Sequence, residues 1–233
     1  MLKSTVANIF NDFISLFYPD YCIACSDSLI KGEQLVCTKC IMEMPQTQFH
    51  LDRNNPLRSR LSHRFPVDQG LAFLKFSKSG KVQQLLHSLK YKNQPEIGQA
   101  LGRVYGNRIK SSISETPFDV IIPVPLHKSK LRRRGYNQST KFAEGLSESL
   151  NIPVVENFLV RKKETQTQTR KSKLKRWENV SEVFEVENAS QLEGKHILIT
   201  DDVITTGATI EACGVALLNR LDCKISVACI AVA

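Results

Sequence analysis

The chain has 233 residues, enough for one large α/β domain or for a domain of about 150 residues with a small appendage. Hydrophobic residues make up 42% and charged residues 24% of it, and there is no low-complexity tract, which excludes disordered, collagen-like and coiled-coil proteins. Its 32 Lys and Arg residues outnumber its 23 Asp and Glu residues, giving a formal net charge of +9. That balance favours polyanionic partners such as nucleic acid, phosphorylated substrates or an acidic membrane face.

The N-terminal stretch up to about Leu16 has the periodicity of an amphipathic helix. Its apolar residues recur at intervals of three and four, at Val6, Ile9, Phe10, Phe13 and Phe17. We expect this helix to pack on its own protein, with attachment to a membrane surface as the alternative. The sequence has neither a run of roughly 18 apolar residues nor a small-residue cleavage site after this stretch. We therefore expect no transmembrane segment and a cytoplasmic location, or a peripheral one at the inner membrane.

Two C-x2-C pairs follow. Cys22 and Cys25 are separated from Cys37 and Cys40 by eleven residues, among which Gly32 suits a tight turn. Brought together by a hairpin, four thiolates can surround Zn²⁺ tetrahedrally, and no coordination position is left for catalysis. We therefore expect a structural Zn²⁺. A disulfide pair or a thiol redox site would fit the pattern less well.

From Leu71 onward, strand-like and helix-like segments alternate, which is typical of an α/β protein. We expect strands at 71–76, 118–124, 196–200 and 225–233, and helices after Val82, Gly135 and Thr209. The sequence thus predicts three parts: an N-terminal helix with a zinc-binding module at 1–45, a linker or irregular wrap at 46–70, and an α/β domain at 71–233.

The stretch after the strand at 196–200 has the composition of a phosphate site. Two carboxylates, Asp201 and Asp202, precede a loop of hydroxyl and small residues that opens a helix: Thr205, Thr206, Gly207, Ala208 and Thr209. Unpaired N–H groups at the helix start, a glycine that accepts positive φ and threonine hydroxyls all favour a bound phosphate. The carboxylates would repel that phosphate, so we expect them to accept hydrogen bonds from sugar hydroxyls or to face Mg²⁺. Ribose 5-phosphate would suit both parts of this stretch, with its hydroxyls at the carboxylates and its phosphate at the loop.

This segment resembles the phosphoribosyl pyrophosphate (PRPP) loop of type I phosphoribosyltransferases. The resemblance implies that Asp201 and Asp202 contact the ribose hydroxyls and that residues 205–209 hold the 5-phosphate. More broadly, the chain is similar to the ComF family, whose members are associated with the uptake or use of DNA. The motifs that carry this similarity, in chain order, are the cysteine pairs, Lys90-Tyr91-Lys92, Pro123-Val124-Pro125-Leu126, Arg134-Gly135-Tyr136-Asn137-Gln138 and the PRPP loop. It implies a type I phosphoribosyltransferase-like parallel sheet flanked by helices, with a small N-terminal zinc-ribbon module, and PRPP bound with Mg²⁺.

Basic residues are concentrated in two segments: five lie within His127–Arg134 and eight within Arg161–Arg176. The resemblance places the pyrophosphate loop after the strand at 118–124, and it implies that Pro123, Val124, Arg134 and Asn137 lie on the pyrophosphate and Mg²⁺ side. We expect the second segment to be a mobile lid over a polyanionic ligand. Both segments could instead be solvated loops, or they could bind single-stranded DNA through its phosphates, with Tyr136 and Trp177 as stacking groups.

Two hypotheses about function follow. The first is an enzyme that transfers a phosphoribosyl group from PRPP to a nitrogen nucleophile and releases pyrophosphate, with no residue assigned as catalytic. The second is a non-catalytic factor of the DNA-uptake machinery, which can be membrane-associated, that binds single-stranded DNA or senses PRPP.

Overall fold

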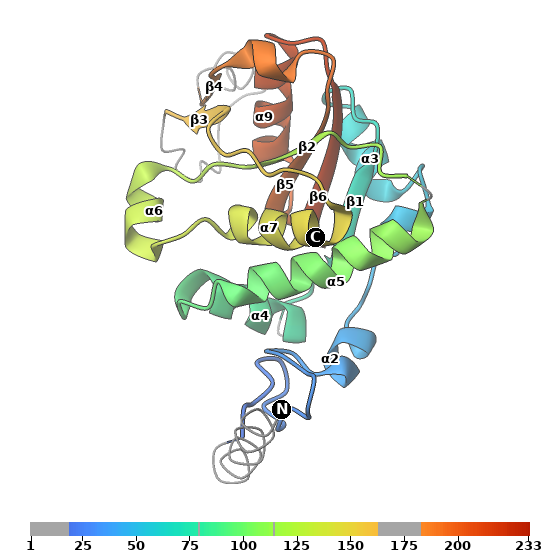
Figure 1. Cartoon of the computed structure of the whole chain (residues 1–233), viewed down its shortest axis with the longest axis vertical. Coiled ribbons are helices and arrows are strands. Elements are labelled where there is room, and N and C mark those ends of the chain that lie inside the picture. Colours follow the sequence, from blue (N-terminus) through green and yellow to red (C-terminus); the bar gives the residue numbers. More distant parts are fainter. Residues whose placement is uncertain (1–18, 79, 114, 163–182) are drawn as a thin grey trace, which may run out of the picture.

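A computed structural model describes residues 19–78, 80–113, 115–162 and 183–233 (Figure 1). The predicted N-terminal helix lies outside these residues, as do most of the second basic segment and Trp177.

A parallel sheet of four strands forms the centre of the molecule. Its strand order is β1 (Gly70–Lys75), β6 (Lys224–Val232), β5 (His196–Ile204) and β2 (Val120–Pro123). All three neighbouring pairs are parallel. The inner strands β5 and β6 are covered on both faces, which explains their nearly continuous apolar sequence. Each of the four predicted strands is present.

The strand boundaries shift by one or two residues from the prediction, except at the end of β5, where the shift is larger. Strand β5 continues four residues past Thr200 because Asp201, Val203 and Ile204 still pair with β6. The two carboxylates therefore belong to the strand itself.

Helices cover both faces of the sheet (Figure 1). On one face lie α4 (Lys81–Tyr91), α5 (Glu96–Ser112) and α7 (Gln138–Leu150). On the other lie α3 (Pro56–Ser62) and α9 (Ala208–Leu218). The remaining elements are short: α2 (Thr38–Glu43), η1 (Phe49–Leu51), α6 (Lys128–Arg134), β3 (Leu159–Arg161), β4 (Phe184–Val186) and η2 (Ala189–Leu192).

The segment 46–70, expected to be a linker or an irregular wrap, carries helix α3 and part of the core. Leu57, Leu61 and Phe65 are buried in the cluster that also contains residues of α9. The Asn55 amide caps α3 and also donates to the Gly70 carbonyl oxygen at 2.9 Å. These contacts fix the segment against the sheet, with the Leu61 side chain next to Gly207 at the start of α9.

Candidate functional site

Asp201 and Asp202 lie near the carboxyl end of β5, where open α/β sheets bind ligands. Asp201 Oδ1 accepts hydrogen bonds from Ser139 Oγ at 2.9 Å and from the Asp202 N–H at 2.8 Å. Asp202 Oδ2 forms an ion pair with Lys90 Nζ at 2.9 Å. Burial and the neighbouring Asp202 charge raise the pKa of Asp201 to about 7. Helices α7 and α4 thus each supply one side chain to the carboxylate pair.

The loop after β5, predicted from the sequence to be an anion site, leads into helix α9. Gly207 is the N-cap of α9 with φ +81°, in the left-handed region that glycine accepts without strain. A cavity of about 40 Å³ is lined by Asp201 and residues 203–210. Thr205, Thr206 and Ala208 are exposed there, and the backbone N–H groups at the start of an eleven-residue helix favour a negative charge.

The residues predicted on the pyrophosphate side divide into two kinds. Pro123 and Val124 are buried at the end of β2, and the Val124 carbonyl oxygen accepts from Asn137 Nδ2 at 2.9 Å. Asn137 Oδ1 in turn accepts from the Ser139 N–H at 3.1 Å as the N-cap of α7. Val124 and Asn137 therefore hold the start of α7 in place. Pro123 and Asn137 also line a second, larger cavity that residues 203–210 do not line.

Arg134 lies at the end of α6, where it contacts the first residue of α7. It donates to Gln138 Oε1 at 2.7 Å, and its guanidinium lies 5.5 Å from the centre of the Tyr91 ring. Two buried donor atoms here, Arg134 Nε and Gln138 Nε2, have no hydrogen-bond partner among the described residues. Unpartnered buried donors cost free energy, so an anion that accepted from them would be stabilised.

The sequence prediction assigned no role to Lys90, Ser139 or Gln138. Lys90 belongs to one of the motifs that carry the ComF resemblance, and that motif is the only sequence signal that pointed to it. Ser139 and Gln138 follow the Asn137 N-cap and reach the site because α7 crosses the ends of β2 and β5.

The four cysteines of the N-terminal module form a cluster that could hold a metal ion. Their sulfur atoms all lie within 4.8 Å of one another, and Cys25 and Cys37 are 3.8 Å apart. Tetrahedral Zn–S bonds of about 2.3 Å would separate two sulfurs by about 3.8 Å. Gly32 has φ +95°, as expected of a turn between the pairs. The cluster packs with the core that includes Leu86 of α4.

The first basic segment forms helix α6, in which Lys128, Arg132 and Arg133 are exposed. Of the second segment, only Arg161 and Lys162 are described. The Arg161 guanidinium lies 5.4 Å from the centre of the Phe184 ring, and Lys162 pairs with Glu185.

None of the described helices has both the length and the hydropathy needed to cross a membrane.

Known proteins resemble the chain over most of its length. A family model described as the phosphoribosyl transferase domain matches residues 87–233. DNA utilization protein YhgH of Shigella flexneri is 28% identical over 212 residues, which cover 90% of this chain and 88% of that protein. Competence protein ComFC of Bacillus subtilis is 26% identical over 209 residues, which cover 88% of this chain and 81% of that protein. A crystal structure of an adenine phosphoribosyltransferase is 18% identical, with a TM-score of 0.40 over 60% of this chain and 71% of that one. The relatives confirm the resemblance to the ComF family, and the chain belongs to the family of phosphoribosyl transferase domains.

Proposed function

We propose that this protein binds PRPP together with Mg²⁺ at the carboxyl ends of β2 and β5 and transfers its phosphoribosyl group to a nitrogen nucleophile, as part of the uptake or use of DNA. The observation that carries the proposal is the Ser139–Asp201 hydrogen bond. It joins the carboxylate pair to the N-terminus of α7, on the sheet edge that also carries the loop 205–209. The printed names of the relatives, a DNA utilization protein and a competence protein, support the biological role.

Each part of the proposed site suits one part of PRPP. The loop 205–209 offers N–H groups and hydroxyls to the 5-phosphate, and Asp201 and Asp202 offer acceptors to the ribose hydroxyls. Arg134 and Gln138 supply the unpartnered donors for the pyrophosphate. In the reaction a nitrogen–C1 bond forms while the C1–oxygen bond breaks, the electron pair leaves with pyrophosphate, and the nitrogen releases a proton to solvent. The protein's part is to hold and orient these groups.

The side chains present suit two metal ions, Mg²⁺ at the carboxylate pair and Zn²⁺ at the cysteine cluster. Carboxylate oxygens are the ligands that Mg²⁺ prefers, and Asp201 and Asp202 are the carboxylates at this site. When bound with PRPP, Mg²⁺ would neutralise charge on the phosphates. The four sulfurs of Cys22, Cys25, Cys37 and Cys40 match the spacing of a structural Zn²⁺ site.

Calorimetric titration of the full chain with PRPP and Mg²⁺ tests the proposal. The parent should bind saturably, and the double variant Asp201→Asn, Asp202→Asn should bind at least about tenfold more weakly, because charge-assisted hydrogen bonds are lost. Asn is preferable to Ala, since its oxygen can still accept from Ser139 and the Asp202 N–H. Asp222→Asn, at an exposed position before β6, is the matched control. No Mg²⁺-dependent binding by the parent, or equal binding by the double variant, would refute the site.

A second function, binding of single-stranded DNA without catalysis, is favoured by one observation. Helix α6 exposes three basic side chains next to the proposed pyrophosphate side. Phosphate contacts of this kind carry no base information, so the binding should have little sequence preference.

A further inference from the structure

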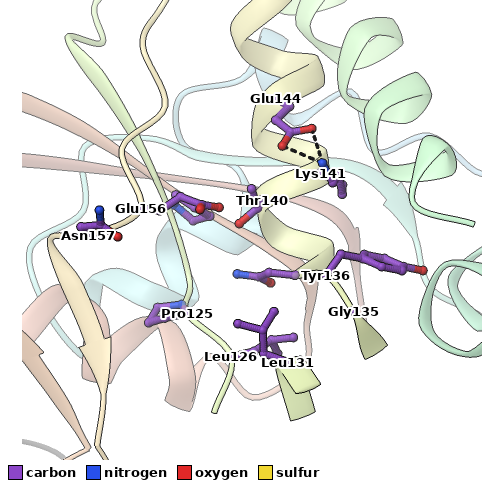
Figure 2. A pocket seen from close by; sticks show the side chains of 12 residues that line it. Pro125, Leu126, Leu131, Gly135, Tyr136, Thr140, Lys141, Glu144, Glu156 and Asn157 are labelled. Carbon is purple, nitrogen blue, oxygen red and sulfur yellow. Dashed lines mark hydrogen bonds and ion pairs between the residues drawn. The ribbon is translucent and has the colours of Figure 1, made fainter. Parts of the chain in front are cut away.

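A separate cavity of about 410 Å³ lies beside α7 (Figure 2). Thr140, Lys141 and Glu144 face it from α7, whereas Ser139 faces Asp201. The segment between β2 and α7 and the turn before β3 supply the rest of its lining, chiefly Pro125, Leu126, Leu131, Glu156 and Asn157. Neither the carboxylate pair nor the loop 205–209 lines it. Its volume falls in the range of small-molecule sites, about 300 to 1,000 Å³.

The floor of the cavity contains an unsatisfied hydroxyl. Thr140 is 8% exposed, and its Oγ1 has no hydrogen-bond partner among the described residues. Figure 2 shows this oxygen directed into the cavity, on the side of Glu156. Buried hydroxyls are nearly always hydrogen-bonded, so a ligand atom that bonded to Thr140 would complete the site.

The charges that line the cavity disfavour an anion. Lys141 Nζ is bonded to both carboxylate oxygens of Glu144, at 2.8 and 2.9 Å, so its charge is compensated. Glu156 is exposed, and no described residue forms an ion pair with it. The residues that line the cavity therefore carry one net negative charge, at Glu156, and the basic residues of α6 are not among them. This carboxylate favours a cation beside it.

The remaining lining is apolar. Pro125, Leu126 and Leu131 form one wall, and Leu131 is 41% exposed although it is a large hydrophobic residue. An apolar ligand body would cover this surface and gain hydrophobic free energy.

We propose that this cavity binds a small molecule with a protonated amino group on an apolar body. An ammonium group has three donors and no acceptor, and the cavity offers it the Glu156 carboxylate, the Thr140 hydroxyl and the Asn157 amide oxygen. The apolar body lies against Leu126 and Leu131. This site goes beyond the proposed function. The cavity shares Pro123 and Asn137 with the residues predicted on the pyrophosphate side, but the three side chains that would bind the ammonium belong neither to the carboxylate pair nor to the loop 205–209.

The test uses phenethylamine as the cationic probe and 2-phenylethanol as its uncharged counterpart, titrated into the full chain. Phenethylamine should bind saturably and at least about tenfold more tightly than the alcohol, because the charge-assisted hydrogen bond to Glu156 is the strongest contact. Glu156→Gln should remove most of that difference. Thr140→Val, which keeps the shape of the side chain, should weaken phenethylamine about fivefold, while Thr140→Ser should retain parent affinity.

Two comparisons separate this proposal from others. Glu115→Gln, at another exposed carboxylate, is the matched control and should bind phenethylamine as the parent does. Mg²⁺–PRPP binding by Glu156→Gln should equal that of the parent, so failure of either proposal leaves the other standing. Equal affinity for the amine and the alcohol, or parent affinity in both Glu156→Gln and Thr140→Val, would overturn the assignment.

Discussion

Lys90 of α4 and Asp202 of β5 form an ion pair, with 2.9 Å between Nζ and Oδ2, although 111 residues lie between them in the sequence. Their side chains are only 24% and 14% exposed. The pair supplies one positive charge to two adjacent carboxylates and so permits both to lie at the same strand end. It also ties helix α4 to the proposed ribose site.

Replacing Lys90 with Met should therefore destabilise the fold. The loss should be about 1 to 3 kcal/mol, below that for a fully buried pair, because water still reaches both side chains. Urea denaturation at pH 8 measures it. Arg103→Met breaks the more exposed pair with Glu148, whose side chains are 40% and 46% exposed, and should cost less than about 1 kcal/mol. Equal losses in the two variants would contradict the importance of the Lys90 pair.

Asp201 should make stability depend on pH. Its folded-state pKa of about 7 is above its ordinary value of 3.8, so between these values the folded state binds the proton more tightly than the unfolded state does. The contribution of Asp201 to stability should therefore fall as the pH rises from about 4 to about 7. Asp201→Asn cannot ionise and should be more stable than the parent at pH 8 by at least about 1 kcal/mol, but not at pH 4. A variant with no gain at pH 8 would argue against a raised pKa.

Gly207 is expected to be structural as well as a ligand contact. An added Cβ would lie 2.8 Å from Leu61 Cδ2, in the direction of α3, so a side chain here disturbs the fold before it reaches a phosphate. Gly207→Ala should cost about 1 to 2 kcal/mol for the left-handed backbone and more for the contact with Leu61. Gly194→Ala is the control, since its φ is +69° but a Cβ there meets nothing within 4 Å. Thermal unfolding should show the larger loss for Gly207→Ala.

The parts of the fold and of the candidate site that depend on local sequence could be predicted, whereas those that depend on tertiary contacts could not. The strands β2, β5 and β6 were predictable because both of their faces are buried, which requires continuous apolar runs. The loop 205–209 was predictable because hydroxyl residues, a glycine and the start of a helix follow one another directly. The cluster of four cysteines was likewise predictable, from the spacing of the two C-x2-C pairs alone.

Features that depend on a distant partner were not predictable. Helix α5 contains Gly98, Gly102 and Gly106, which weaken helix propensity, and their purpose appears only in the contact with α7. A Cβ at Gly145 of α7 would lie 2.1 Å from the Gln99 carbonyl oxygen of α5, so the two helices touch through their backbones. In the same way, Lys90 and Ser139 reach the carboxylates only because α4 and α7 pack on one face of the sheet.

The purified protein should carry about one Zn²⁺ per chain, held by the four cysteines. Cys37→Ser should reduce the zinc content to near zero and make residues 19–44 more sensitive to protease, because Cys37 is buried among the other thiols. Elemental analysis and limited proteolysis measure these effects. Cys223→Ser, outside the cluster, should keep its zinc. Freshly prepared protein with free cysteines and no zinc would disprove the site.

The last prediction concerns DNA. If exposed basic residues of α6 bind the phosphates of single-stranded DNA, the triple variant Lys128→Gln, Arg132→Gln, Arg133→Gln should lower affinity and reduce the slope of log affinity against log salt by roughly 2, since each neutralised phosphate on a single strand contributes about 0.7. Arg134 is left intact because it is bonded to Gln138 and stacked on Tyr91. The matched control, Lys39→Gln, Lys110→Gln, Lys195→Gln, removes the same charge from exposed positions elsewhere and should change the slope much less. Fluorescence anisotropy with a labelled oligonucleotide at several salt concentrations measures both slopes. If the two triple variants reduce the slope equally, the attraction comes from the net charge of the whole protein and α6 is not a binding surface.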